Sequence, residues 1–184
     1  MTDLACAVIA LAGGDATPRC AAALARDTGT DPVLIDRTMP GGDTVPGRRR
    51  AALARTAAGA QAAGAQAGAL VAMVEDTTLV APGWAAAVRT SFADPAVAAA
   101  WGPVHIDPAL GARYRALGRM EYGRFHGGSP RPQSPPGNCL VFRRAALEAV
   151  LAPGRGLAEH EVAADLRARG WTIAYAPGAA STYA

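Results

Sequence analysis

The chain has 184 residues and a mass of 18.6 kDa, the size of one domain with a hydrophobic core. Hydrophobic residues make up 51% of it but aromatic residues only 5%, so we expect small core side chains and helices packed close to a sheet. The formal net charge is +3, without a basic stripe interleaved with aromatic residues, which argues against nucleic-acid binding.

The basic residues are all arginine, and their densest run is Arg48-Arg49-Arg50, followed by Arg55. Because these four residues fall at helical spacing, we interpret them as a solvated helix face. The three cysteines are scattered and include no Cys-x-x-Cys pair, which excludes a zinc ribbon and a disulfide framework. They are expected to be small core residues of a protein in a reducing compartment.

Two observations bear on localisation. The apolar run at residues 4–12 has no basic residue before it and leads into Gly13-Gly14-Asp15, so it is expected to be a strand rather than a signal peptide. No stretch is long and apolar enough to span a bilayer. We therefore expect a cytoplasmic protein without a membrane span.

In chain order, short apolar runs alternate with longer helical segments. Strands are expected at residues 5–11, 32–36, 71–74, 96–101, 140–142 and 171–175. Helices are expected at residues 18–27, 48–67, 84–92, 107–125, 144–151 and 159–169. Residues 126–137 are dense in Pro and Gly and predict a loop. This alternation predicts a mainly parallel sheet with helices on both faces.

The third expected strand, residues 71–74, runs directly into Glu75-Asp76-Thr77. Acidic residues at the carboxyl end of such a strand stand where open α/β sheets bind ligands. The competing interpretation is a plain turn in which Asp76 and Thr77 bond the nearby backbone. Gly13-Gly14, after the first strand, lacks the Gly-x-Gly-x-x-Gly pattern of a dinucleotide site.

Several short motifs occur in an order and spacing that resemble those of the family 2 glycosyltransferases with the GT-A fold. They are Asp36 after the second strand, Glu75-Asp76-Thr77, Pro82-Gly83-Trp84, Gly102-Pro103-Val104, Gly137-Asn138 through Phe142-Arg143-Arg144, Glu159-His160, and Tyr175-Ala176-Pro177. The resemblance implies a single α/β domain of the GT-A-like (nucleotide-diphospho-sugar transferase) type. Its nucleotide-binding half would be residues 1–104, and its acceptor-side half residues 105–184.

The resemblance also implies a function: transfer of a sugar, with inversion, from a nucleotide-activated donor to a hydroxyl acceptor. The residues that it assigns to the nucleotide sugar are Gly13, Asp36, Glu75, Asp76, Thr77, Asn138 and Arg131. Three positions depart from the family pattern: Thr77 replaces an acid, His160 replaces an Asp, and Tyr183 lies near an expected His. These departures leave an alternative, a degenerate transferase that serves as a nucleotide- or partner-binding module.

The candidate catalytic set is His160 with its neighbours Glu159 and Glu161. An inverting transfer needs a base for the acceptor proton, and histidine titrates close to working pH. Glu159 and Glu161 can orient the imidazole, and Glu161 is itself a second candidate base. Alternatively, both acids only favour the start of a helix, and His160 is a surface residue.

The leaving diphosphate needs a positive charge beside it. Asp76, with Glu75 and the Thr77 hydroxyl, forms a candidate site for Mg²⁺ or Mn²⁺. The alternative is a metal-independent site in which an arginine neutralises the diphosphate, with Arg119, Arg124 and Arg131 as candidates.

Overall fold

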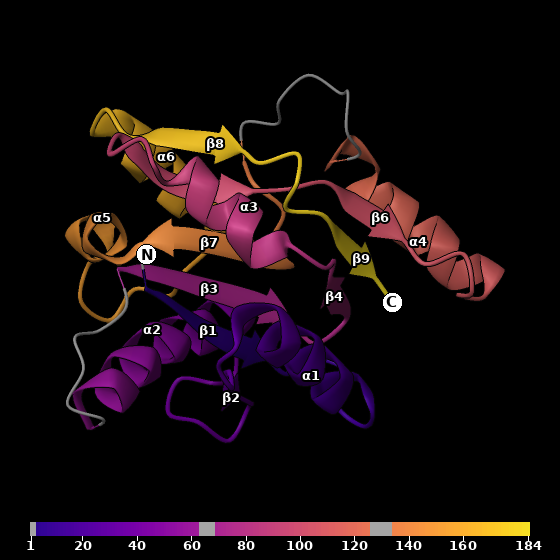
Figure 1. Ribbon diagram of the computed structural model, residues 1–184. Coiled ribbons are helices and arrows are strands. Elements are labelled where there is room, and N and C mark those ends of the chain that lie inside the picture. Colours follow the sequence, from indigo (N-terminus) through magenta and orange to yellow (C-terminus); the bar gives the residue numbers. More distant parts are fainter. Residues whose placement is uncertain (1–2, 63–68, 126–133) are drawn as a thin grey trace.

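The computed structural model describes residues 3–62, 69–125 and 134–184 of the chain (Figure 1). Its helices are α1 (Ala16–Thr28), α2 (Val45–Ala62), α3 (Trp84–Ser91), α4 (Ala112–Tyr122), α5 (Arg144–Val150) and α6 (Glu159–Ala168), with a 3-10 turn, η1 (Gly123–Phe125). Its strands are β1 (Leu4–Ile9), β2 (Val33–Ile35), β3 (Leu70–Glu75), β4 (Thr78–Val80), β5 (Val97–Trp101), β6 (Val104–Ile106), β7 (Cys139–Arg143), β8 (Thr172–Tyr175) and β9 (Ser181–Tyr183).

The main sheet has six strands in the order β2-β1-β3-β7-β5-β8. Only β7 runs antiparallel to its neighbours β3 and β5, while the β1–β2, β1–β3 and β5–β8 pairs are parallel. Helices cover both faces, so the predicted mainly parallel sheet flanked by helices is confirmed. The carboxyl ends of β1, β2 and β3 therefore meet the amino end of β7 at one edge of the sheet (Figure 1).

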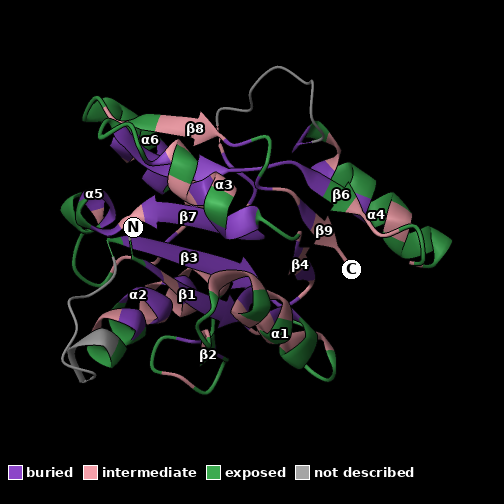
Figure 2. Ribbon diagram, viewed as in Figure 1, coloured by how far each residue is buried: buried purple, intermediate pink, exposed green. Residues whose placement is uncertain are grey.

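Each face of the sheet has its own hydrophobic core. On one face α1 and α3 pack through residues such as Leu24 and Trp84. On the other face α2, α5 and α6 pack through residues such as Leu53, Leu147 and Leu166. The central strands are buried along their whole length (Figure 2). As the composition predicts, many of the side chains buried at the sheet are Ala, Val and Cys.

A second, three-stranded sheet was not predicted from the sequence. Its order is β4-β9-β6, with β9 antiparallel to β4 and parallel to β6. It lies beyond the carboxyl edge of the main sheet and carries α4 on its outer side (Figure 1). An aromatic cluster of Trp101, Tyr122, Phe125, Tyr175 and Tyr183 packs around this junction.

Several predicted boundaries differ from the observed ones. The helix expected from residue 48 begins at Val45, because Pro46 is tolerated in the first turn, where a helix needs no backbone donor. The helix expected at residues 107–125 is confined to α4 and η1. Residues 63–68, the end of the second expected helix, and residues 126–133, most of the expected loop, lie outside the described residues.

Two further expectations concern cysteines and membrane helices. Cys6, Cys20 and Cys139 are free and buried, so their interpretation as core residues is confirmed. Within the described ranges, no helix has the length and apolar character needed to cross a bilayer.

Candidate functional site

The acids after β3 lie between two other segments of the chain. The backbone N–H of Asp76 donates to the carbonyl of Ile9 at the end of β1, 3.0 Å away. The backbone N–H of Glu75 donates to the carbonyl of Asn138, which precedes β7, at 2.8 Å. These bonds join the end of β3 to the loop after β1 on one side and to the start of β7 on the other.

The Asp76 carboxylate holds the loop after β1. Its Oδ1 accepts hydrogen bonds from the backbone N–H of Leu11 (2.9 Å) and Ala12 (3.1 Å). Its Oδ2 accepts from the N–H of Gly13 (3.0 Å) and the hydroxyl of Thr17 (2.7 Å). Four donors match the four acceptor positions of a carboxylate, so the Asp76 side chain is fully engaged within the protein.

Burial and these hydrogen bonds act in opposite directions on the Asp76 pKa. Burial raises it, but the donors of Leu11, Ala12, Thr17 and Gly13 together outweigh burial and hold the pKa below its ordinary value. The ionised Asp76 carboxylate thus fixes residues 11–13, a loop that contains Gly13, one of the predicted nucleotide-sugar contacts.

Glu75 forms an ion-pair cluster with Arg49 of α2 and Glu159 of α6. Arg49 Nη2 lies 2.9 Å from Glu75 Oε1, and Arg49 Nη1 pairs with Glu159 Oε2. The same guanidinium donates to the carbonyls of Gly137 (3.0 Å) and Leu157 (3.4 Å). The prediction of a solvated face is therefore wrong for Arg49, which is only 4% exposed.

The position of Arg49 is explained by the helix period. Arg49, Ala52, Leu53 and Thr56 are spaced i, i+3, i+4 and i+7, and all four are buried. Arg49 is therefore the first residue of the core-facing stripe of α2. This spacing is the sequence signal that could have identified it, because the neighbours Arg48 and Arg50 fall off that stripe.

The cluster changes the pKa of both carboxyl groups. Burial raises the pKa of Glu75, and the attraction of Arg49 only partly offsets this rise. Burial also acts on Glu159, but there the Arg49 guanidinium, the helix backbone and nearby His160 prevail and lower the pKa. The cluster therefore presents one firmly ionised carboxylate and one that is driven toward its protonated form.

This cluster forms the floor of a cavity of about 380 Å³ at the same edge of the sheet. The cavity is lined by Arg49, Glu75, Glu121, Tyr122, Arg124, Phe125, Ser134, Pro135, Pro136, Gly137, Glu159 and His160. Two predicted catalytic residues, Glu159 and His160, are thus brought together with Glu75. Carboxylates, a guanidinium and aromatic rings on one concave surface suit a ligand that carries hydroxyl groups.

Glu161, the third member of the predicted catalytic set, lies outside this lining. Its Oε2 accepts from Arg155 Nη2 at 2.9 Å and from Arg155 Nε at 3.2 Å. Arg155 also pairs with Asp165 at 2.6 Å, one turn further along α6. Glu161 therefore ties the loop before α6 to the exposed side of that helix.

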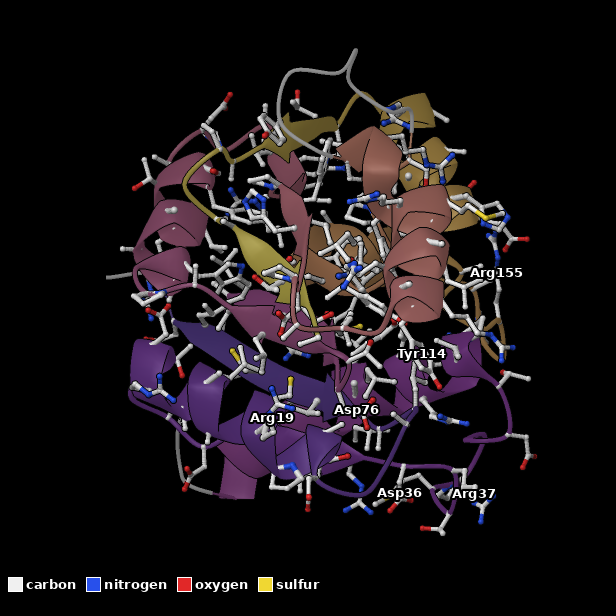
Figure 3. All side chains as sticks on the ribbon, turned by 90° about the vertical axis from the view of Figure 1, so that its right-hand side faces the viewer. Arg19, Asp36, Arg37, Asp76, Tyr114 and Arg155 are labelled. Carbon is white, nitrogen blue, oxygen red and sulfur yellow. The ribbon has the colours of Figure 1, made fainter. Side chains whose placement is uncertain are left out.

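Asp36 lies in the loop after β2 and is exposed. It accepts hydrogen bonds from the backbone N–H (2.8 Å) and the hydroxyl (2.6 Å) of Thr38, and these bonds lower its pKa. Figure 3 shows Asp36 beside Arg37 near the lower edge of the molecule, whereas Asp76 lies further inside. The two predicted nucleotide contacts thus follow strands β2 and β3, which are separated by β1, and they have no hydrogen-bond partner in common.

The remaining predicted contacts differ in accessibility. Gly13 belongs to the braced loop and has a left-handed φ of 70°. Thr77 is half-buried in the turn before β4, and its carbonyl accepts from the N–H of Ala184 at 2.9 Å. Asn138 is fully buried and donates from Nδ2 to the Thr78 hydroxyl at 3.0 Å. Arg131 lies outside the described residues.

The acids do not fit a divalent cation. Both oxygens of Asp76 are engaged by the protein, and Glu75 and Glu159 share one guanidinium. In the part of the chain that the structure describes, no group of three or more His, Cys, Asp or Glu side chains is placed to hold a metal ion. A metal at this strand end would have to displace Arg49 or the loop after β1.

Comparisons by sequence found no match, either among protein-family models or among curated proteins. In structure, the chain is similar to GalNAc-T7, solved with UDP, GalNAc and Mn²⁺: the TM-score is 0.65 and the identity 13%, over 98% of this chain and 44% of that one. It is also similar to the bifunctional IspDF from Campylobacter jejuni, with a TM-score of 0.54, 10% identity, and coverage of 96% and 50%.

A third similar structure is glucosyl-3-phosphoglycerate synthase from Mycobacterium tuberculosis, solved with Mn²⁺, UDP-glucose and phosphoglyceric acid. Its TM-score is 0.51 at 12% identity, over 99% of this chain and 72% of that one. The chain thus spans less than half the length of GalNAc-T7 and half that of IspDF. At these identities the likeness shows the fold alone: the chain is an α/β domain with a GT-A-like fold.

Proposed function

We propose that this chain transfers a sugar from a nucleotide-activated donor to a hydroxyl acceptor. The observation that carries the proposal is the cavity at the carboxyl edge of a GT-A-like sheet, which Glu75, Arg49 and Glu159 line together with the exposed His160. Open α/β sheets bind ligands at this edge. The hydroxyl-binding character of the lining supports a sugar or its acceptor as the occupant.

The nucleotide would bind beside this cavity, along the loop that Asp76 braces and the loop that contains Asp36. Two of the similar structures hold uridine nucleotides, UDP in one and UDP-glucose in the other. Uridine nucleotides are therefore the first probes for this chain. Asp36 is assigned to the base, and Gly13 and its neighbours to the ribose and diphosphate.

In the proposed reaction, His160 takes the proton of the acceptor hydroxyl as the oxygen attacks the anomeric carbon. The bond between that carbon and the diphosphate oxygen breaks, and the nucleotide diphosphate leaves with the bonding electrons. Arg124 lines the cavity and is the described arginine that we assign to the leaving diphosphate. Glu159 precedes His160 in α6 and lines the same cavity.

The test is a thermal-stability panel of UDP, GDP, ADP, CDP and TDP, followed by release of the diphosphate from the matching glucose donor. A nucleotide that binds the native state raises the unfolding midpoint by mass action. His160→Ala is expected to lower turnover by about 10²–10⁴-fold, the usual contribution of a general base. Glu161→Ala, which removes a carboxylate outside the cavity, is the matched control and should keep turnover within about threefold of the wild type.

A binding module without turnover is the second candidate. It is favoured by protein contacts that engage both carboxylate oxygens of Asp76 and one carboxylate oxygen of Glu75. This candidate predicts a nucleotide-dependent rise of the midpoint with no diphosphate release. Turnover that is lost in His160→Ala would contradict it, and turnover that survives this substitution would contradict the assignment of the base.

A further inference from the structure

The ion-pair cluster of Arg49, Glu75 and Glu159 indicates which positive charge occupies the end of β3. We propose that the Arg49 guanidinium takes the place of a divalent cation at the end of β3, so that this site binds its ligand without a metal ion. The ligand's identity rests on the proposed function, but the exclusion of the cation follows from the cluster itself.

Arg49 makes unusually many contacts for a residue of a helix. Its Nη1 and Nη2 reach two carboxylates, Glu75 and Glu159, and two backbone carbonyls, those of Gly137 and Leu157. The two carboxylates come from β3 and α6, which are far apart in the sequence. A planar guanidinium, with several N–H groups in a fixed fork, bridges such a set where a single ammonium group cannot.

The cluster leaves no place for a second positive charge. The guanidinium lies between the two carboxylates, and its positive charge repels any dication that approaches the same oxygens. Asp76, at the same strand end, has both oxygens occupied, and Glu121 of α4 also lines the cavity. Glu75 and Glu159 can therefore hold Mn²⁺ together only if Arg49 is removed.

Arg49 also sets the geometry of the cavity wall. It fastens the first residue of α6, Glu159, to the end of β3, and it fastens Gly137 to the same point. A Cβ on Gly137 would lie 2.6 Å from Arg49 Nη2, so the loop before β7 approaches the guanidinium closely. Arg49 is thus a positioning residue for the helix end that presents His160.

The first test needs no variant: Mn²⁺ is titrated into the wild-type protein without nucleotide, and free Mn²⁺ is followed by its paramagnetic resonance signal. We expect no saturable Mn²⁺ site, and a nucleotide-induced midpoint shift that is unchanged when a chelator replaces Mn²⁺. A saturable site that is abolished by Glu75→Gln would overturn the proposal. Because the titration contains no nucleotide, it remains decisive even if the chain binds no nucleotide at all.

The second test removes the guanidinium. Arg49→Met leaves Glu75 and Glu159 without their shared guanidinium, and we expect a saturable Mn²⁺ site that the wild type lacks, because paired carboxylates are ligands for hard cations. Adding Glu75→Gln to this variant should remove this site. A merely structural role of Arg49 would lower stability without creating a Mn²⁺ site, and that result would contradict the proposal.

Arg50→Met is the matched control. Arg50 is the next residue of α2, but its guanidinium donates to the carbonyls of Ala152 and Arg155, outside the cavity. Its loss frees no carboxylate, so Mn²⁺ binding should stay as in the wild type. A gain of Mn²⁺ affinity in this variant equal to that of Arg49→Met would show that the effect is not specific to the cluster and would overturn the inference.

Discussion

Asp76 and Arg49 show how two charged residues can serve the same edge of the sheet in different ways. Asp76 accepts four hydrogen bonds and fixes the loop after β1, whereas Arg49 donates to two carboxylates and fixes α6. Each side chain satisfies buried partners that would otherwise be costly to leave unpaired. Ion pairs and hydrogen bonds within the protein thus join the segments at this end of the sheet.

The substitution Asp76→Asn tests how much the hydrogen bonds of the Asp76 carboxylate contribute to stability. An amide offers one oxygen and directs its NH₂ group at backbone N–H donors, so it keeps at most two of the four bonds. We expect a loss of roughly 2–4 kcal/mol in the free energy of unfolding at neutral pH, measured by urea denaturation.

The stability effect of Asp76→Asn should depend on pH. Because the folded-state pKa of Asp76 lies below its ordinary value, the stability that the carboxylate contributes is present above about pH 4 and is lost as the pH falls through the folded pKa. The difference in the free energy of unfolding between the wild type and Asp76→Asn should therefore become smaller at acidic pH. Asp36→Asn, at an exposed carboxylate, is the control and should change stability much less. An equal difference at neutral and acidic pH would contradict this account.

Some residues of the cavity could be predicted from the sequence and others could not. Glu159 and His160 could be placed near Glu75 because their motifs follow a known order. Arg49 could not, since its role depends on two carboxylates distant in sequence and on the rotation of α2 about its axis. The hydrogen bonds of Asp76 to residues 11–13 could not be predicted either. Asp and Thr in a turn are expected to bond the nearby backbone and not the loop after another strand.

At the scale of elements, the boundary between the two sheets depends on one close approach. Gly102 lies between β5 and β6, and its backbone passes against the turn before β9. A Cβ at this position would overlap the carbonyl of Ala179 and lie 3.0 Å from the carbonyl oxygen of Ala176. Backbone atoms cannot move aside as a flexible side chain can, so this site admits only glycine.

Gly102→Ala is expected to destabilise the fold by about 3 kcal/mol, the upper end of the range for overpacking. Gly59→Ala provides the contrast. Gly59 lies in α2 with open space around its Cα, so alanine there should raise stability by up to about 1 kcal/mol through helix propensity. Thermal melts of the two variants should move in opposite directions, and a Gly102→Ala midpoint equal to that of the wild type would contradict the packing argument.

The small sheet was missed for a reason that belongs to this scale. Its strands have three residues each, too few for an alternating pattern to be distinguished from a loop. The apolar runs of β1, β3 and β5 are longer, so these strands could be predicted from the sequence. Direction was not readable either: alternation of strands and helices predicts parallel strands, and nothing in residues 139–143 signals that β7 runs the other way.

At the scale of the whole molecule, the two halves proposed from the sequence are interleaved. β7 belongs to residues 105–184 but lies between β3 and β5, both from residues 1–104. Cys6 in β1, Cys20 in α1 and Cys139 in β7 belong to one hydrophobic cluster. The proposed nucleotide half and acceptor half are therefore not units that we expect to fold separately.

The reactivity of the three cysteines can show whether the whole chain unfolds in one cooperative step. Burial raises the pKa of Cys6 and of Cys20 to about 12, and raises that of Cys139 as well, so none should react as a thiolate in the folded protein near neutral pH. In increasing urea, thiol labelling followed by mass spectrometry of peptides should show all three becoming reactive at one midpoint, which matches the loss of helical circular dichroism. If Cys139 became reactive at a urea concentration where Cys6 and Cys20 stayed protected, residues 105–184 would unfold on their own. That outcome would require the inserted strand β7 to leave the sheet while β3 and β5 remained in place, and the pairing of β7 with both strands argues against it.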